Sequence, residues 1–492
     1  MLDNRISFYK KYKPWLFKAS NSHLKRPEVI NTLEKLQNDY VICSIDKASN
    51  NFVFVCKKFF LLTLMNELGI DKNSMMCLGN QTYTPVLINE KGIVEEHCKL
   101  LWEKFKLHVN EENQRLPRIF WNPKLHKTPF KARFIAGATN CSTKKLSKLV
   151  NKALQVVLIG FRKYCKAIYR RTGINCDWGI NSTSQFLDKL NNETEIYNAQ
   201  VYDFSTLYTN LELDEVKTAM KGMLDLTFNS DKNKFINISL RKNEQFFSNK
   251  RYSGHYIFDK TLLLEATTFI LDNAYVTFGN FVLKQNWGIT MGGNCSTELS
   301  NCTLGWFEYV YMKSLINRKD HAGWPLAKLL SGNSRFVDDL ITLNYKNFGN
   351  LYQKIYPSCL QMERCGNEYQ NVNYLDVNFI MDGKGHYTTN IYNKLDDFDF
   401  PVVQYTFPSS NMPHEVGHNV FYGQILRYAV LCSQKCTFVT AIRKLYKTLT
   451  DRGYKHNALI KKFRKALGNN PKLVLKYNIS DSREIENSIF KR

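Results

Sequence analysis

Two adjacent carboxylates stand inside an otherwise apolar stretch near the middle of the chain, in Phe336-Val337-Asp338-Asp339. Arg335 precedes them and Leu340 and Ile341 follow, which predicts two buried strands joined by a hairpin with the acids at its tip. Neighbouring carboxylates in such a place repel each other unless a cation lies between them. The pair therefore predicts a divalent metal site at the tip of the hairpin. This prediction depends on a third acid at the end of another buried strand.

That third acid is Asp203, at the end of a short apolar strand that opens with Val201. The next segment, Leu211-Glu212-Leu213-Asp214, leads into a predicted helix. Two-metal nucleotidyl transfer needs acids from separate strands to hold two Mg²⁺ ions about 4 Å apart, one at the attacking oxygen and one at the leaving group. We predict that Asp203, Asp338 and Asp339 are the catalytic and metal-binding residues.

Further blocks lie on either side of these acids in the order found in reverse transcriptases. Motifs A, B and C of that family resemble, in turn, Asp203, Trp287-Gly288-Ile289-Thr290-Met291-Gly292-Gly293 and Phe336-Val337-Asp338-Asp339. The fingers of Penelope-like retroelements are similar to Pro123-Lys124-Leu125-His126-Lys127, Arg133-Phe134-Ile135 and Leu146-Ser147-Lys148. Their late palm resembles Tyr374-Leu375-Asp376-Val377 and Ile391-Tyr392-Asn393-Lys394. The resemblance spans roughly residues 40 to 465.

The resemblance implies an α+β fold, a right-hand polymerase with fingers, a palm built of an antiparallel sheet with helices, and a helical thumb. We expect an N-terminal extension with helices and a hairpin at 1–110, fingers at 111–200, a palm with some finger segments at 201–405, the thumb at 406–475 and a tail at 476–492. The implied activity is RNA-directed DNA synthesis. Its cofactor would be Mg²⁺, with Mn²⁺ as an alternative, and its partners an RNA template, a DNA primer and deoxynucleoside triphosphates.

The same resemblance assigns nucleotide contacts. Lys124 and Arg133 would bind the triphosphate, and arginine suits that task because its planar fork donates two parallel hydrogen bonds to phosphate oxygens. Met291, Gly292 and Gly293 would touch the template base pair and the nucleotide, since glycine lets a backbone approach a ligand closely.

Tyr208 matches the place where such polymerases carry an aromatic ring beneath the sugar of the nucleotide. A ring there would clash with a 2′-hydroxyl, which favours deoxynucleotides; the alternative is that Tyr208 is a core aromatic. Two features depart from the family pattern. Phe336 replaces the commoner tyrosine, and residues 360–368 contain no lysine to serve as general acid, so that acid stays unassigned.

The chain is strongly basic, with 68 Lys and Arg against 44 Asp and Glu and a net charge of +24. Such a charge suits a polyanionic partner, whose counterions are released when basic groups neutralise phosphates. Residues 142–171 predict a helix with one packed and one cationic face; Lys144 and Lys148 on the latter would track template phosphates, although a solvated face is the ordinary interpretation. Three helical stripes between residues 420 and 467 predict the thumb, whose Arg427, Lys461 and Arg464 would face the duplex.

The N-terminal region gives two further expectations. Residues 1–38 are basic and form either an RNA-binding arm or a helical extension on the fingers, with a helix that opens at Pro27. Two β-rich runs, 40–43 and 52–55, are joined by a polar stretch that ends at Asn50-Asn51, which predicts a hairpin. Asp46-Lys47 in that stretch resembles a short block upstream of the fingers in Penelope-like elements.

Cysteine usage and hydropathy bear on location. The 13 cysteines are odd in number and scattered, so we interpret them as free core thiols in a reducing compartment. We expect neither a signal peptide nor a membrane span, and an intracellular protein whose nuclear location follows only from its implied activity. Penelope-like elements often carry an endonuclease after the thumb; we expect none here, so that another protein nicks the target or synthesis starts from existing 3′ ends.

Two alternatives remain open at this point. An RNA-dependent RNA polymerase would share the acids and differ in its tolerance of ribonucleotides. A domesticated, non-catalytic RNA-binding scaffold would share the basic charge, but the intact Asp203, Asp338 and Asp339 argue against it.

Overall fold

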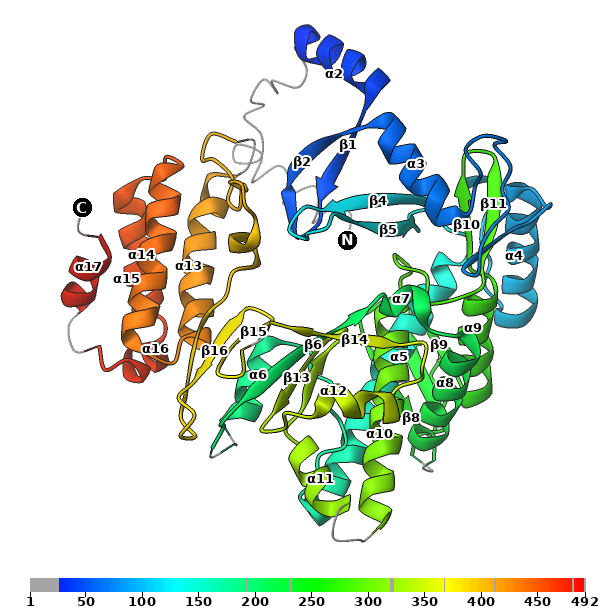
Figure 1. The fold of residues 1–492 in the computed structure, drawn as a ribbon. Helices are drawn as coiled ribbons and strands as arrows, with labels where there is room; N and C mark the ends of the chain where they lie inside the picture. The colour runs from blue at the N-terminus through cyan, green and yellow to red at the C-terminus, as the bar shows by residue number, and fades with distance from the viewer. Residues whose placement is uncertain are drawn as a thin grey trace.

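The computed structural model describes residues 26–191, 193, 195–229, 232–318, 323–366, 368–410, 413–479 and 482–490. The predicted basic arm lies mostly outside them; its described part forms α2 (Pro27–Asp39), which opens at Pro27 as expected. Elements from three parts of the chain surround a central space (Figure 1). Strands from residues 40–137 lie above it, a sheet with helices from the middle of the chain lies below it, and the C-terminal helices lie beside it.

A four-stranded antiparallel sheet, the palm sheet, lies below the central space in the order β12-β13-β6-β14. Its strands are β6 (Ala199–Ser205), β12 (Ser334–Phe336), β13 (Asp339–Leu343) and β14 (Gln361–Cys365). Successive residues of a strand face opposite sides. Tyr202, Phe204 and Leu340 therefore pack into one core, while Val201 and Ile341 pack into another. Both faces of the sheet are buried, which holds its strands rigidly.

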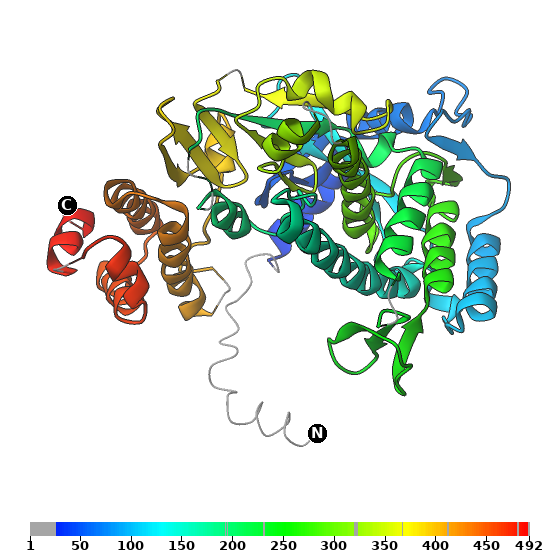
Figure 2. The ribbon, with the colours of Figure 1, turned by 90° about the horizontal axis from the view of Figure 1, so that it is seen from below.

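Helices cover one face of the palm sheet. They are α5 (Lys144–Thr172), α8 (Leu213–Thr227), α9 (Lys260–Asp272), α10 (Ser296–Arg318) and α11 (Gly323–Leu330). The helix α5 confirms the prediction for residues 142–171, buries Leu146, Val150 and Phe161, and runs across the helical layer (Figure 2). A small sheet beside this layer consists of β7 (Phe235–Ser239), β8 (Gln245–Ser248) and β9 (His255–Phe258). The other face is covered by α6 (Thr183–Leu190), β15 (Asn371–Tyr374), β16 (Val377–Met381) and β17 (Tyr387–Ile391).

The predicted acidic hairpin is confirmed, with β12 and β13 joined by a two-residue turn, Val337-Asp338, between the paired Phe336 and Asp339. Val337 has a φ of 57°. This left-handed region is costly for a β-branched residue, so the surrounding structure must hold the turn in place.

Arg335 supplies that support. Its Nη1 donates hydrogen bonds of 3.0 Å to the carbonyl oxygen of Val337 and of 3.0 Å to Oδ1 of Asn301. Its guanidinium is buried and forms an ion pair with Glu308 of α10. The Glu308 carboxylate also accepts a hydrogen bond of 2.8 Å from the hydroxyl of Tyr356. A paired and hydrogen-bonded buried charge thus anchors the acidic turn to the helical layer.

A five-stranded sheet, the fingers sheet, lies above the central space in the order β3-β11-β10-β4-β5. Its strands are β3 (Tyr83–Pro85), β4 (Arg118–Lys124), β5 (Lys131–Gly137), β10 (Tyr275–Phe278) and β11 (Phe281–Gln285). The strands β4 and β5 confirm the predictions at 119–121 and 133–136. Because the sheet also takes β3 from residues 83–85, the expected limit at 110 divides it, whereas β10 and β11 lie in the range that was expected to hold the palm with some finger segments.

A separate hairpin packs against the fingers sheet. It consists of β1 (Tyr40–Ile45) and β2 (Ala48–Cys56), and it is followed by α3 (Lys57–Leu68) and α4 (Glu90–Phe105). The hairpin was predicted, but its turn is Asp46-Lys47, with Lys47 at a φ of 67°. Asn50-Asn51 belongs to β2, so the prediction of a loop ending there is wrong.

The C-terminal helices form one bundle, the thumb, around a core of its own. They are α13 (His414–Leu431), α14 (Lys435–Asp451), α15 (His456–Gly468), α16 (Pro471–Lys476) and α17 (Ser482–Phe490). The three predicted apolar stripes are buried in it. Ile485, Ile489 and Phe490 of α17 join the same core. Residues 482–490 are therefore part of the bundle and not the expected tail.

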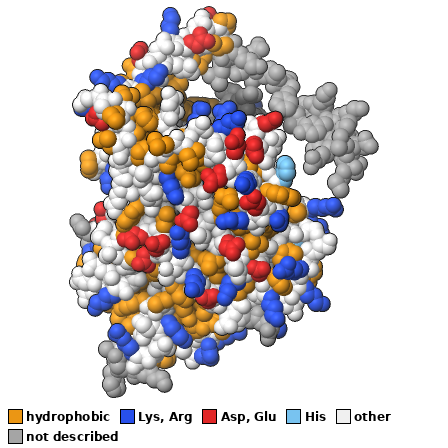
Figure 3. Space-filling view, turned by 90° about the vertical axis from the view of Figure 1, so that its right-hand side faces the viewer, with side chains coloured by type: hydrophobic (Ala, Val, Ile, Leu, Met, Phe, Trp, Pro, Cys, Tyr) orange, Lys and Arg blue, Asp and Glu red, His pale blue; other side chains and the backbone are white. Residues whose placement is uncertain are grey.

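The surface is mixed in charge where Figure 3 displays it. Lys and Arg side chains alternate with acidic and hydrophobic ones over the face turned toward the viewer. Among the helices that the structure describes, none combines the length and the hydropathy needed to cross a bilayer.

Replacing Glu308 by glutamine should destabilise the protein. Glutamine keeps the shape of the side chain but leaves the buried Arg335 unpaired, and breaking a buried ion pair from one side costs about 3–5 kcal/mol. We expect the midpoint of thermal unfolding to fall by about 5 °C or more. Glu112→Gln, at an exposed acid, serves as the control. Equal midpoints for both variants would contradict the anchoring role of the ion pair.

Candidate active site

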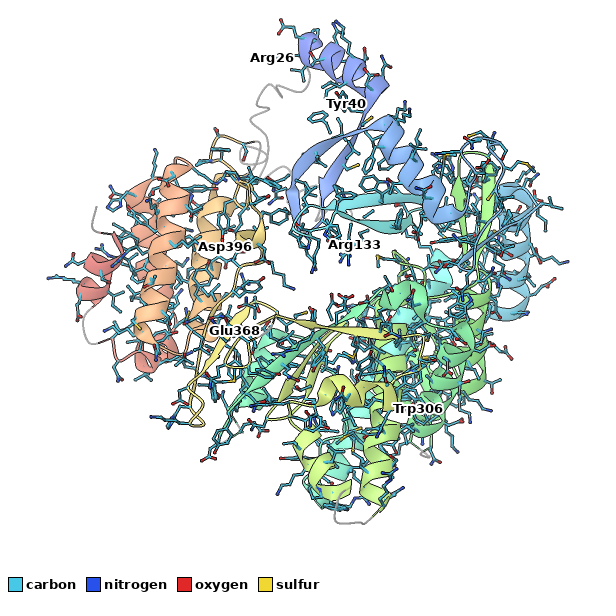
Figure 4. All side chains as sticks on the ribbon, in the orientation of Figure 1. Arg26, Tyr40, Arg133, Trp306, Glu368 and Asp396 are labelled. Carbon is cyan, nitrogen blue, oxygen red and sulfur yellow. The ribbon has the colours of Figure 1, made fainter. Side chains whose placement is uncertain are left out.

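A cavity of about 550 Å³ lies between the β4–β5 hairpin and the palm sheet. Its walls contain the three predicted catalytic acids, Asp203, Asp338 and Asp339, and both predicted triphosphate contacts, Lys124 and Arg133. Figure 4 shows Arg133 at the upper border of this space, with Glu368 on the palm below. Residues that are far apart in the sequence thus meet around one space.

The strand register places the acids. Asp203 of β6 is directly opposite Asp339 of β13. Opposite residues of an antiparallel pair project to the same side, with Cβ atoms about 5 Å apart. Asp338 lies in the turn beside them, and its carbonyl oxygen accepts a hydrogen bond of 3.4 Å from the backbone N–H of Phe204. The backbone therefore holds the three carboxylates at one corner of the palm sheet.

Burial and neighbouring carboxylates disfavour the ionised forms of Asp203 and Asp339. The pKa of Asp203 is raised to about 6, first by burial and then by the neighbouring charges of Asp338 and Asp339. Burial also raises the pKa of Asp339, which the ammonium group of Lys394 opposes from a distance of 3.8 Å. A cation near this cluster would relieve the unfavourable interactions that hold these pKa values up.

The acids are suited to a divalent metal, although they are not gathered around a common point. Within the described residues, no three His, Cys, Asp or Glu side chains form a ready-made metal site. Carboxylates opposite each other on paired strands repel, and a hard cation with oxygen ligands removes that repulsion. Asp203 combines burial, two carboxylate neighbours and a raised pKa. This chemistry fits Mg²⁺ or Mn²⁺ at Asp203, Asp338 and Asp339.

The fingers side of the cavity is cationic. Lys124 lies at the end of β4, and Arg133 is paired across the hairpin with Asn122. The pKa of Lys124 is lowered, first by burial and then by the positive charge of Arg133. An anion between these two side chains would favour the charged lysine and reduce the repulsion. The fingers therefore offer an anion site opposite the acids.

Asp46, Lys47 and Lys394 are three of the charged residues that line the cavity without having been assigned a role from the sequence. Their only signal was membership of blocks that resemble those of Penelope-like elements. Neither periodicity nor local composition distinguishes a charged residue in a cavity wall from one on an ordinary surface.

The glycine-containing loop at 286–295 bridges fingers and palm. Gly292 has a φ of 108°, and a Cβ there would lie 2.3 Å from the carbonyl oxygen of Ala136 on β5. The backbone N–H of Ala136 donates a 2.8 Å hydrogen bond to the carbonyl oxygen of Met291. A Cβ on Gly288 would lie 2.1 Å from the carbonyl oxygen of Tyr208 in α7 (Leu207–Asn210). The residues that line the cavity do not include Met291, Gly292 or Gly293 of this bridge, nor Tyr208 of α7, which the bridge contacts.

Two predicted nucleic-acid contacts form ion pairs inside the protein. Arg427 on α13 pairs with Asp376 of the palm, with Nη2 2.6 Å from Oδ2. Arg464 on α15 donates to both carboxylate oxygens of Glu486 on α17, at 2.9 and 2.7 Å. Both arginines keep exposed surface, with Arg427 41% and Arg464 62% exposed, and α17 lies on the side of the thumb away from the central space (Figure 1). The nucleic-acid contacts of Lys144, Lys148, Arg427, Lys461 and Arg464 stay predictions.

Comparison with known proteins yields structural similarity only. No family model and no curated protein matches the sequence. Telomerase from Candida albicans, solved with a TWJ fragment of telomeric RNA, has a TM-score of 0.57 and 12% identity, over 99% of this chain and 74% of that chain. The fold is similar to that of telomerase. This finding confirms the expected mixed α and β fold, whereas the resemblance to Penelope-like elements rests on the motifs.

Two other structures give lower scores. Apo telomerase from Candida tropicalis has a TM-score of 0.48 and 11% identity, over 98% of this chain and 72% of that chain. The RNA-dependent RNA polymerase of a human picorbirnavirus has a TM-score of 0.41 and 10% identity, over 99% of this chain and 88% of that chain.

The raised pKa of Asp203 predicts a dependence of stability on pH in metal-free buffer. The folded state, with a pKa of about 6, binds the proton more tightly than the unfolded chain, with a pKa of about 3.9. This contribution to stability is complete below the unfolded pKa and is lost as pH rises through the folded pKa. We expect the melting temperature of the wild type, relative to Asp203→Asn, to rise as the pH falls from 7 to 5. Parallel curves for the two proteins would contradict the raised pKa.

Proposed function

We propose that the chain is an RNA-directed DNA polymerase of a Penelope-like retroelement, which adds deoxynucleotides to the 3′-hydroxyl of a primer. One observation carries this proposal. The cavity brings Asp203, Asp338 and Asp339 on the palm opposite Lys124 and Arg133 on the fingers, in a fold similar to that of a telomerase. Carboxylates and phosphate-binding cations on facing walls suit transfer of a nucleotide from a metal-bound triphosphate.

Asp203, Asp338 and Asp339 would hold two Mg²⁺ ions, or alternatively Mn²⁺. When bound, the ions would lower the barrier by favouring the ionised primer hydroxyl and the departing pyrophosphate. The rigid palm sheet contributes by keeping the carboxylates in position before substrate arrives.

The fingers would bind the triphosphate. Arg133 offers a planar set of N–H donors to phosphate oxygens, and Lys124 adds a point charge at the end of β4. Because both side chains belong to one hairpin, they would approach the nucleotide together and orient its α-phosphate toward the acids. The general acid that protonates pyrophosphate remains unassigned.

An RNA template and a DNA primer fit the charge and the fold. The net charge of +24 favours a polyanionic duplex. The candidate contacts to its phosphates are Lys144, Lys148, Arg427, Lys461 and Arg464. The similar telomerase was solved with telomeric RNA, which supports an RNA partner. Tyr208 is the candidate for discrimination against ribonucleotides, which separates this function from that of an RNA-dependent RNA polymerase.

Primer extension tests the proposed function. On poly(rA) with oligo(dT), dTTP and Mg²⁺, we expect the wild type to extend the primer and Asp338→Asn to be slower by at least about a hundredfold, because one carboxylate of the metal site is lost. The matched control is Asp214→Asn, whose side chain is 95% exposed. Extension by Asp338→Asn at the wild-type rate would refute the metal site. Salt-sensitive RNA binding without extension by any variant would favour the scaffold alternative.

Replacing Tyr208 by alanine tests the choice of sugar. Without the ring, the use of UTP relative to dTTP should rise by about 10- to 100-fold, since a steric block to the 2′-hydroxyl is removed. Tyr208→Phe keeps the ring and should keep the wild-type ratio. The measurement is the ratio of kcat/KM for the two nucleotides on the same primer and template. A wild type that uses both equally well would favour the RNA polymerase alternative.

A further inference from the structure

The turn of the β1–β2 hairpin reaches into the candidate active site. Asp46 and Lys47, its two turn residues, both line the cavity that holds the three palm acids. The backbone N–H of Asp46 donates a hydrogen bond of 3.0 Å to the carbonyl oxygen of Pro123 on β4. Lys47 has a left-handed φ of 67°, which a lysine adopts only at some cost. The turn is thus fixed against the fingers sheet in a conformation that presents charges to the cavity.

Asp46 forms an ion pair with Arg133. Oδ1 of Asp46 lies 3.0 Å from Nη1 of Arg133, and the aspartate is 8% exposed whereas the arginine is 30% exposed. The ion pair does not satisfy all the hydrogen-bonding atoms of the two side chains. Within the described residues, Oδ2 of Asp46 and Nε of Arg133 are buried without a hydrogen-bond partner. Buried polar atoms without partners are costly, and a ligand or water that bonds to them relieves that cost.

The hairpin that carries Asp46 is held on its other side as well. Nδ2 of Asn51 donates to the carbonyl oxygen of Val403 at 3.1 Å, and the backbone N–H of Val403 donates to Oδ1 of Asn51 at 2.7 Å. Ile45 and Ala48 flank the turn and pack in one cluster with Phe398. The hairpin therefore packs on one side against the fingers and on the other against the segment that connects palm and thumb. These contacts fix the backbone position of Asp46 relative to Arg133.

We propose that Asp46 is a positioning residue of the nucleotide site, which orients the guanidinium of Arg133 toward the triphosphate of the incoming nucleotide. The inference rests on the proposed function, because it takes Arg133 as a phosphate contact. A guanidinium has five N–H donors in a rigid plane. The carboxylate of Asp46 occupies one part of that plane and leaves the rest for phosphate oxygens. Lys47 lies next to it and adds a cation to the same wall.

Electrostatics and positioning predict opposite signs for the loss of the Asp46 charge. If Asp46 were only a negative charge in the cavity, its removal would make the site more positive and strengthen the binding of an anionic triphosphate. If Asp46 positions Arg133, its removal releases a long side chain from a fixed geometry and weakens binding. The sign of the change therefore decides between the two roles.

The test measures binding of dTTP without chemistry. The protein is saturated with poly(rA) and an oligo(dT) primer that ends in a dideoxynucleotide, and the Kd of dTTP is determined in Mg²⁺. We expect Asp46→Asn to raise this Kd by about tenfold and the exposed control Asp214→Asn to leave it unchanged. An unchanged or lower Kd for Asp46→Asn overturns the proposal.

Two further variants complete the test. In an Arg133→Gln background, Asp46→Asn should no longer raise the Kd; a further rise there would mean that Asp46 acts by another route and would overturn the proposal. If Asp46→Asn fails to fold, Asp46→Glu keeps the charge but displaces the carboxylate, and it too should raise the Kd. With Asp46→Asn unfolded, a wild-type Kd for Asp46→Glu also overturns the proposal.

Extension of a primer with a free 3′-hydroxyl is measured beside the binding experiment. Absence of extension by the wild type would overturn the proposed polymerase function, while the dTTP affinities would still judge the role of Asp46. A wild type that neither extends the primer nor binds dTTP would overturn both.

Discussion

The buried ion pair between Arg335 and Glu308 supports the strand pair on which the site depends. It joins the helical layer to β12, and the same guanidinium holds the left-handed turn at Val337. From the other face of the sheet, the hydroxyl of Tyr374 donates a 3.3 Å hydrogen bond to the carbonyl oxygen of Asp339. The backbone of the acidic turn is therefore hydrogen-bonded from both faces of the palm sheet. The backbone segments that carry the carboxylates cannot separate without breaking buried polar contacts, each of which is costly to lose.

The cavity also depends on how the palm and fingers sheets are held relative to each other. The acids belong to the palm sheet and the cations to the fingers sheet, so the site exists only where the two layers meet. The loop at 286–295 sets that meeting, because its backbone contacts Ala136 on the fingers side and Tyr208 on the palm side at distances that exclude a Cβ. Glycines 288 and 292 are thus required by the close approach of two backbones, whether or not they also touch a nucleotide.

Local patterns predicted the parts of the molecule that local forces determine. The acidic hairpin, the strands β4 and β5, the basic helix α5 and the apolar thumb stripes follow from periodicity and turn chemistry over a few residues. Partners distant in the sequence could not be predicted in this way. Glu486 lies 22 positions from Arg464 and pairs with it, and residues 83–85 complete a sheet with strands near residue 280. A count of charges or of apolar spacing contains no information about such pairings.

The β1–β2 hairpin shows the same limit in one element. Asn50-Asn51 resembles a turn because short amide side chains commonly satisfy a reversing backbone. Here both residues lie in a strand, and their amides bond to the backbone of Gln404 and Val403, more than 350 residues away. The turn lies instead at Asp46-Lys47, beside the cavity. Contacts over such a distance in the sequence link the hairpin that carries Asp46 to the segment that leads into the thumb.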